Sequence, residues 1–212
     1  MDAKVNAVER LRVEAPRKAR GRVLLSSVTD PYQPLEKRYE LTRRLLVVLR
    51  DNGYPIEILT KSDLVTRDAD IVTEFDEAEV GLTVTALDDR VRRSFEPGAS
   101  PVEARLRALK EFSERGIPTY AFLGPMIPYL SDEGLGELLD ALADRVGRLM
   151  VDRLNIKCGN LPLIRAVLKD NYPDLATMFE EALPPTSAYY ANLRAKVMEM
   201  CRQRSIPVEV VY

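Results

Sequence analysis

The chain alternates between short apolar runs and longer amphipathic runs, and this alternation restricts the folds that it can adopt. Five apolar runs predict β-strands, at 22–27, 55–62, 78–87, 117–127 and 147–156. The runs between them predict helices, at 35–53, 68–75, 100–116 and 131–146. Alternation of strands and helices predicts a parallel sheet with the helices packed against its outside.

The number of strand–helix units limits the architecture further. Five units are too few for a closed eight-stranded barrel, which takes about 250 residues. We therefore expect an α/β fold, either a partial (β/α) TIM-type barrel or an open doubly wound sheet. After Ile156 the pattern changes to helices, predicted at 161–170, 173–181 and 186–204, before a short strand at 206–212.

We expect one domain with three parts. Residues 1–22 form a basic N-terminal segment, with seven Lys/Arg against three Asp/Glu and one short helix predicted at 6–14. Residues 23–157 form the α/β region, and residues 158–212 form a helical extension that ends in the short strand. In the α/β region, Ser100 with Glu103 three residues later predicts a capped helix start.

Composition excludes several kinds of active site. The 212 residues contain no histidine and two cysteines, Cys158 and Cys201, which have no metal-ligand spacing. A Ser-His-Asp site, a Cys-His site or a histidine-ligated zinc site cannot be built from such a chain. The net charge of −2 gives no general argument for nucleic-acid binding. Without an apolar run of about 18 residues or a signal peptide, we expect a cytoplasmic protein.

Polar side chains gather where the predicted strands end. In parallel α/β folds these ends meet at one edge, where ligands bind, so the sequence predicts a site for a small, polar, zwitterionic ligand. The residues concerned are Ser26, Ser27, Thr29, Asp30 and Tyr32 after the first strand, Thr60, Lys61 and Ser62 after the second, Thr83, Thr85 and Asp88 after the third, Gly124 and Pro125 in the fourth, and Asp152, Arg153, Asn155 and Lys157 after the fifth.

Each of these residues also has a purely structural interpretation. Asp30 before Pro31 can start a turn or cap a helix, and Lys61 can be a solvated loop residue. Thr83 is a β-branched residue that suits any strand. The prediction of a site therefore depends on the convergence of several strand ends.

Taken together, the motifs resemble a known family. "SSVTDPYQPLEKRY", "ILTKS", "EVGLTVTALDD", "FEPGASPVEARLRAL" and "VDRLNIKCGN", in this order and spacing, are similar to radical SAM proteins of the spore photoproduct lyase-like, or DNA repair photolyase-like, group. The resemblance implies a partial (β/α) barrel that binds S-adenosylmethionine across its strand ends, beside a 4Fe-4S cluster held by a CxxxCxxC loop.

This chain departs from that pattern at its start. It has no CxxxCxxC motif, and Val23–Ser27 resembles the second strand of the family, so we expect the first strand to be missing. A truncated chain, a misplaced start at Met1 and a natural loss of the cluster are the simplest explanations. Since iron–sulfur clusters need thiolate ligands and the cofactor carries the radical step, we do not expect radical chemistry from the chain as written.

The resemblance also assigns residues to the ligand. Thr29 and Thr83 fall at polar contacts to S-adenosylmethionine, and Lys61 falls on the lysine that pairs with its carboxylate. Asp30 could take the ligand ammonium, and Tyr32 could line the pocket or belong to the core. Ser27 falls near the hydrogen-donating cysteine of spore photoproduct lyase, and a hydroxyl cannot replace a thiol in that step.

Three functions follow as hypotheses. The first is a radical SAM-type domain that binds S-adenosylmethionine, with nucleic acid as a candidate substrate of the complete enzyme. The second is a cluster-less binding or scaffold protein, whose exposed edge at Val23–Ser27 pairs with a second copy or is covered by the N-terminal segment. The third, a phosphate- or sugar-binding enzyme, is disfavoured because no glycine-rich phosphate loop is visible.

Overall fold

The computed structural model describes residues 4–25, 29–156 and 159–212. Six strands form one sheet in the order β1-β2-β3-β4-β5-β6, and every neighbouring pair is parallel. Their bounds are Val23–Leu25 (β1), Ile56–Thr60 (β2), Ala78–Thr83 (β3), Thr119–Met126 (β4), Arg148–Arg153 (β5) and Val208–Val210 (β6). The predicted parallel α/β sheet is confirmed, and its last strand lies beside β5.

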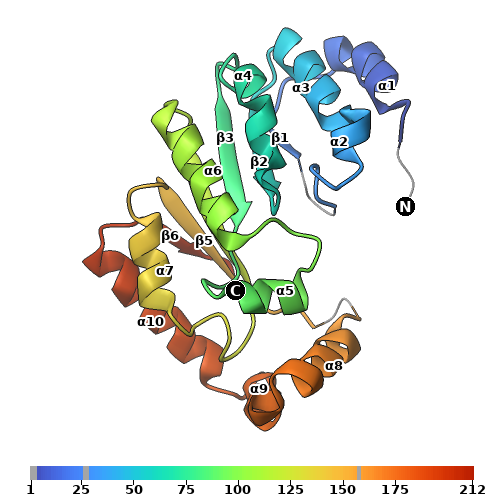
Figure 1. The fold of residues 1–212 in the computed structure, drawn as a ribbon. Coiled ribbons are helices and arrows are strands. Elements are labelled where there is room, and N and C mark those ends of the chain that lie inside the picture. Colours follow the sequence, from blue (N-terminus) through green and yellow to red (C-terminus); the bar gives the residue numbers. More distant parts are fainter. Residues whose placement is uncertain (1–3, 26–28, 157–158) are drawn as a thin grey trace.

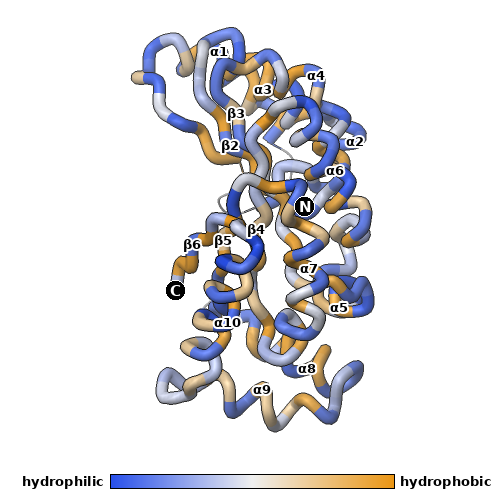
Figure 2. The backbone as a smooth tube through the Cα atoms, turned by 90° about the vertical axis from the view of Figure 1, so that its left-hand side faces the viewer, coloured by the Kyte–Doolittle hydropathy of each residue, from blue (hydrophilic) through white to orange (hydrophobic). Residues whose placement is uncertain are grey.

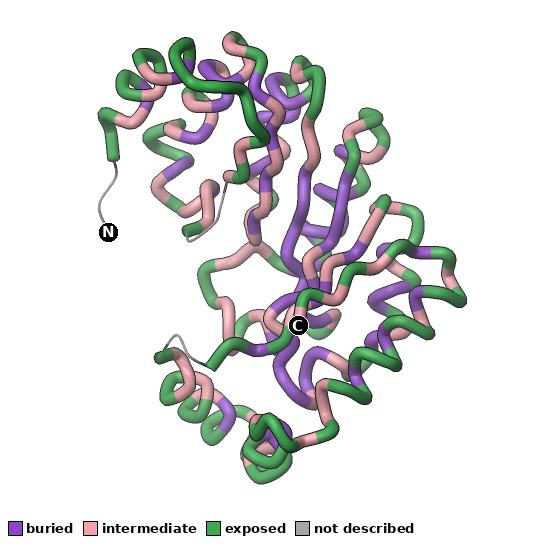
Figure 3. The backbone as a smooth tube through the Cα atoms, turned by 180° about the vertical axis from the view of Figure 1, so that it is seen from behind, coloured by how far each residue is buried: buried purple, intermediate pink, exposed green. Residues whose placement is uncertain are grey.

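The helices connect the strands, and several of them cover one face of the sheet in Figure 1, while the opposite face is in view in Figure 3. Their bounds are Ala7–Glu14 (α1), Ala15–Arg17 (η1), Glu36–Tyr39 (α2), Leu41–Asp51 (α3), Asp63–Asp68 (η2), Ala69–Val72 (α4), Asp89–Phe95 (α5), Val102–Glu114 (α6), Leu135–Leu142 (α7), Leu161–Asn171 (α8), Pro173–Leu175 (η3), Ala176–Ala182 (α9) and Tyr189–Gln203 (α10).

The helix predicted at 35–53 is broken into α2 and α3. Glu40 lies between them with a left-handed φ of 45°. The Glu36 carboxylate accepts hydrogen bonds from the backbone N–H groups of Thr42 (3.0 Å) and Arg43 (3.3 Å), which are among the first donors of α3. A buried carboxylate thus caps a new helix start, and the chain turns there.

The start of the helix predicted at 100–116 also differs. Pro101 stands directly before α6 and has no capping side chain of its own, and the backbone N–H of Val102 donates instead to Asp89 Oδ1 at 3.2 Å. Ser100 instead contacts Asp63: its Oγ accepts the backbone N–H of Asp63 at 2.9 Å and donates to Asp63 Oδ1 at 2.6 Å. The predicted Ser100 cap is therefore wrong, because this hydroxyl joins two loops.

Side chains along the strands alternate between the helix-covered face and the open face. On β2, Ile56, Ile58 and Thr60 are buried, whereas Glu57 and Leu59 are half-buried. The larger core joins the strands to α3, α6, α7 and α10. Figure 2 shows the matching pattern, with apolar stretches along the strands and mixed hydropathy along the helices.

On the open face, the ring of Tyr120 on β4 lies over Gly81 of the neighbouring strand β3. A Cβ atom at Gly81 would lie 2.2 Å from Cζ of the Tyr120 ring, so this position has no room for a side chain. The Arg148 guanidinium lies 4.1 Å from the centre of the same ring, and it forms a bidentate ion pair with Glu79 at 2.8 Å. Ring and ion pair together fill the sheet surface near the amino ends of the strands.

We predict that Gly81→Ala lowers the free energy of unfolding by about 1–3 kcal/mol, because the added methyl overpacks against the Tyr120 ring. Urea denaturation measured by circular dichroism tests this. Gly98→Ala is the matched control, since nothing lies within 4 Å of its Cβ position. Equal stabilities of the two variants would contradict the packing that we describe.

Candidate functional site

The carboxyl ends of the parallel strands lie at one edge of the sheet, and the loops that follow them form the candidate site. The loop after β1 returns to β2 through Asp30. Asp30 Oδ1 accepts hydrogen bonds from Thr60 Oγ1 (2.6 Å) and the backbone N–H of Tyr32 (2.8 Å), and Oδ2 accepts the backbone N–H of Lys61 (2.7 Å). Both carboxylate oxygens thus hold the loop in place beside the end of β2.

The other residues predicted after β1 have different positions. Thr29 is exposed at the edge of the described chain, and Ser26 and Ser27 lie outside the described residues. Tyr32 is 2% exposed and belongs to the core, and its hydroxyl donates to Asp68 Oδ2 at 3.2 Å. Burial, supported by the nearby Asp68 carboxylate, raises the pKa of Tyr32 well above its ordinary value. Of the two interpretations of Tyr32, its burial favours the core residue over the pocket residue.

Asp68 extends this contact into an ion network under the loop. It forms ion pairs with Arg67 at 2.7 Å and Arg43 at 3.0 Å. Arg67 also reaches Glu36 at 2.9 Å, which is the carboxylate that caps α3. The network joins α2, α3 and η2. It thereby holds the loop between β1 and α2 in its path away from the sheet.

A second charged cluster lies at the ends of β2 and β3. Lys61 Nζ is 2.7 Å from Glu96 Oε1, and Arg105 Nη1 is 2.9 Å from Glu96 Oε2. Arg105 Nη1 also donates to the Thr83 carbonyl at 2.8 Å, and Thr85 Oγ1 donates to Glu96 Oε1 at 2.8 Å. The cluster thus brings together Lys61 and Thr83, two residues predicted from separate strands.

Burial makes this cluster electrostatically strong. The Arg105 and Glu96 side chains are 1% and 8% exposed, whereas Lys61 is 38% exposed. Desolvation raises the pKa of Glu96, but the charges of Lys61 and Arg105 outweigh it, so the pKa lies below its ordinary value. Two cations and one carboxylate leave a net charge of +1, and Lys61 is the member that solvent reaches.

Sequence reasoning did not find Glu96 or Arg105. Glu96 lies in the "FEPGAS" stretch, whose Pro and Gly suit a turn. Arg105 stands three residues after Val102 and four before Leu109, a spacing that places it on the apolar face of α6 and is the one signal in the sequence that it is buried. Arg105 Nη2 is buried and has no hydrogen-bond partner within the described part of the chain. A buried guanidinium with a spare donor is a feature that only the folded chain shows.

The fifth strand contributes Asp152 and Arg153. Asp152 is half-buried, and desolvation raises its pKa above the ordinary value against the opposing effect of Arg153. Leu154, which follows, is held by a hydrogen bond from its backbone N–H to the Tyr190 hydroxyl at 3.2 Å. Lys157 and Cys158 lie outside the described residues.

The residues of this chain do not fit a 4Fe-4S cluster. Cys201 is buried in α10, where desolvation raises its pKa above the ordinary value, so it remains a neutral core thiol. The sequence holds one further cysteine. Across 4–25, 29–156 and 159–212, no group of three metal-binding side chains is found.

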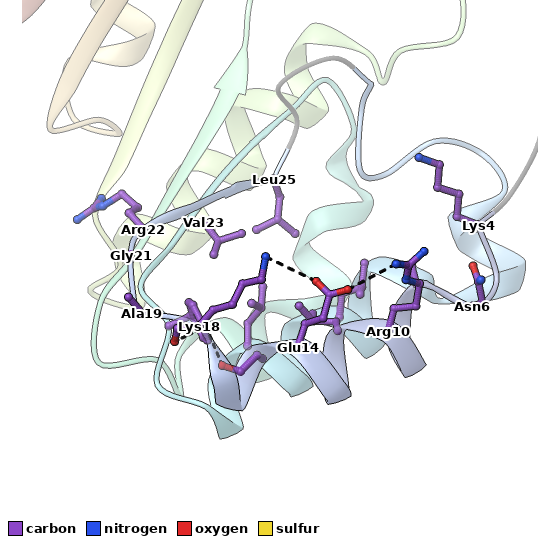
Figure 4. A pocket seen from close by; sticks show the side chains of 16 residues that line it. Lys4, Asn6, Arg10, Glu14, Lys18, Ala19, Gly21, Arg22, Val23 and Leu25 are labelled. Carbon is purple, nitrogen blue, oxygen red and sulfur yellow. Dashed lines mark hydrogen bonds and ion pairs between the residues drawn. The ribbon is translucent and has the colours of Figure 1, made fainter.

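A groove of about 870 Å³ lies beside the free edge of β1 (Figure 4). Helix α1 packs against α3, and the chain then returns along Lys18–Arg22 to β1. The groove lies between α1 and β1. Its apolar wall is formed by Leu11, Val23, Leu25, Leu45, Leu49 and Tyr54, and charged side chains at its rim include Lys4, Arg10, Glu14, Lys18 and Arg22.

These features define a partial barrel of parallel strands with polar groups at the carboxyl ends. The profile of the Radical SAM superfamily matches residues 4–142. The chain belongs to this superfamily. Across the described residues, no helix is long and apolar enough to span a membrane.

Curated relatives are uncharacterized proteins. One from Methanocaldococcus jannaschii is 43% identical over 113 residues, which cover 53% of this chain and 43% of that protein. One from Mycobacterium bovis is 28% identical over 222 aligned positions, covering 98% of this chain and 62% of that protein. The chain therefore spans about half of the length of these two relatives.

Solved structures show the same fold at low sequence identity. Spore photoproduct lyase complexed with dinucleoside spore photoproduct superposes with a TM-score of 0.68 at 15% identity, covering 99% of this chain and 66% of that one. Streptococcus suis SuiB bound to S-adenosylmethionine gives a TM-score of 0.62 at 14% identity, covering 100% of this chain and 44% of that one. The predicted partial TIM-type barrel is confirmed.

We predict that Glu96→Gln lowers the free energy of unfolding at neutral pH by about 3–5 kcal/mol, because it leaves a buried Arg105 without its counter-ion. Since the pKa of Glu96 is lowered by folding, its stabilisation is complete above the ordinary carboxyl pKa of about 4.3 and is lost as pH falls through the folded pKa.

The difference between wild type and Glu96→Gln should therefore shrink below about pH 4. Urea denaturation at neutral and acidic pH measures it. Glu103→Gln, which removes an exposed carboxylate from α6, is the control and should change little at either pH. A difference that does not depend on pH would contradict the charged cluster.

Proposed function

We propose that this chain is an S-adenosylmethionine-binding domain, with the ligand at the carboxyl ends of the strands and its carboxylate on Lys61. The observation that carries the proposal is the positive cluster of Lys61, Glu96 and Arg105. A lysine ammonium has three donors, and Glu96 occupies one of them. The others remain available to a ligand carboxylate in the solvent-exposed part of the cluster.

The surrounding residues support a zwitterionic ligand. Thr29 is exposed at the same edge, and the strand-end Thr83 is 3% exposed beside the cluster. The half-buried Asp152 carboxylate lies near the carboxyl end of β5. Both carboxylate oxygens of Asp30 accept hydrogen bonds that hold the loop in place. We therefore assign Asp30 mainly to positioning the loop, and contact with the ligand ammonium is its second proposed role.

The proposal is limited to binding. Reductive cleavage of S-adenosylmethionine is the chemistry that a 4Fe-4S cluster supplies in this superfamily, and the residues present do not fit that cluster. We derive no radical step from them. For a complete enzyme that supplies the cluster, nucleic acid remains a proposed substrate.

We predict that wild-type protein binds S-adenosylmethionine in iron-free calorimetric titration and that Lys61→Ala weakens this binding by about 1.5–3 kcal/mol, the value of a charged hydrogen bond. Lys110→Ala, which removes an exposed lysine from α6, is the matched control and should bind as wild type does. Equal binding by Lys61→Ala and wild type would show that the carboxylate lies elsewhere.

A second candidate function is that of a scaffold, and the open β1 edge favours it. Among the described residues, strand β1 pairs only with β2, and an apolar groove lies beside it (Figure 4). Unpaired strand edges are templates for pairing with another chain. We propose that a second copy of this chain occupies the edge.

Light scattering coupled to size-exclusion chromatography tests this candidate. We predict a dimer for wild type and a monomer for Leu24→Lys, because an edge charge opposes strand pairing. Leu24 is 46% exposed, so the change should leave the fold intact. Leu163→Lys, at a 73% exposed position of α8, is the control. A monomeric wild type would exclude this candidate.

A further inference from the structure

A polar hollow of about 430 Å³ lies between α5 and α8, separate from the charged cluster of Lys61. Its lining consists of Arg90, Arg93, Ser94, Asn171 and Tyr172. The two helices pack against each other, and they lie side by side in Figure 1. Because α5 follows β3 and α8 follows β5, the hollow is on the same side of the sheet as the strand carboxyl ends.

Helix α5 turns one face toward the core and another toward the hollow. Val91 is buried in a second apolar cluster, and Phe95 packs against that cluster. Arg90, Arg93 and Ser94 have the i, i+3, i+4 spacing that places side chains on one helix face. The packing of α5 therefore presents two guanidinium groups and a hydroxyl together.

These guanidinium groups lack close counter-ions. Within the described ranges, no salt bridge joins Arg90 to an acidic residue. Arg93 Nε is 4.0 Å from Asp89 Oδ2, whereas Arg92 bonds both Asp89 oxygens, at 2.8 and 3.0 Å. The hydrogen bonds from Arg92 lower the pKa of Asp89, so Arg92 is the main partner of this carboxylate.

The wall of the hollow that faces α5 is the end of α8, and it does not repel an anion strongly. Carbonyl groups at a helix end carry partial negative charge, but those at the end of α8 have internal partners. The Val167 carbonyl accepts Asn171 Nδ2 at 3.0 Å, and the Leu168 carbonyl accepts the Tyr172 N–H at 2.7 Å. The Tyr172 ring stacks on Phe95, with centroids 6.2 Å apart and planes at 17°, which forms a flat side of the hollow.

We propose that the hollow between α5 and α8 binds a phosphate group. Two guanidinium forks and a hydroxyl offer more donors than the two oxygens of a carboxylate can accept, and they suit the several oxygens of a phosphate. The phosphate can be free or part of a nucleotide chain, and the flat Tyr172 ring would lie against the attached group in the second case. The inference is independent of S-adenosylmethionine binding at Lys61.

Three probes separate the sources: inorganic phosphate, a thymidine dinucleotide and a short fluorescein-labelled oligodeoxythymidylate. Calorimetry measures the first two, and fluorescence anisotropy at several salt concentrations measures the third. We expect Arg90→Ala/Arg93→Ala to lower affinity for the bound probes about tenfold or more. The slope of log affinity against log salt concentration should also become shallower, by about 0.7 for each phosphate of the single strand that the variant no longer neutralises.

Arg202→Ala, at an exposed position of α10, is the control for loss of surface charge and should leave phosphate binding unchanged. S-adenosylmethionine titration of the double variant should match wild type, which keeps a failure of this proposal distinct from a failure at Lys61. The absence of binding by all three probes, or equal losses of affinity per arginine in the control and the double variant, would overturn the phosphate site.

Discussion

Parallel pairing of the strands is the constraint on which the rest of the structure depends. It sends every connection back across the helix face and brings the carboxyl ends of the strands to one edge. Residues that are distant in sequence are then placed along that edge: Lys61 follows β2, Thr83 ends β3, and Asp152 lies near the end of β5. A shift by one residue in any strand would turn its side chains to the other face.

Buried and half-buried carboxylates then hold the loops at this edge. Asp30 bonds the backbone of the next strand end, Glu36 caps α3, and Glu96 joins the loop after α5 to Lys61 and Arg105. In each case the acid accepts several hydrogen bonds, which compensates for its loss of hydration. These acids order the edge, while the end of Lys61 stays exposed to solvent, where we propose that a ligand binds.

The sheet, its parallel order and most helices could be predicted from the sequence because apolar periodicity reports which faces are buried. The break at Glu40 could not, since it depends on Glu36 reaching the N–H groups of Thr42 and Arg43 across the turn. The partnership of Lys61 with Glu96 and Arg105 was equally hidden, because it joins residues up to 44 positions apart. Polar strand ends predict where a site lies, and tertiary contacts decide which of their atoms remain available.

The same distinction applies to the charged surfaces outside the strand ends. Most arginines of this chain have acidic partners, as Arg92 has Asp89 and Arg148 has Glu79, and such pairs leave little field for a ligand. Arg90 and the solvent-exposed end of Lys61 are different, because the described residues give Arg90 no acidic partner and give Lys61 one, Glu96. A net charge near zero therefore still leaves local positive groups, and Arg90 and Lys61 are two of them on the strand-end side, where we propose that anionic parts of ligands bind.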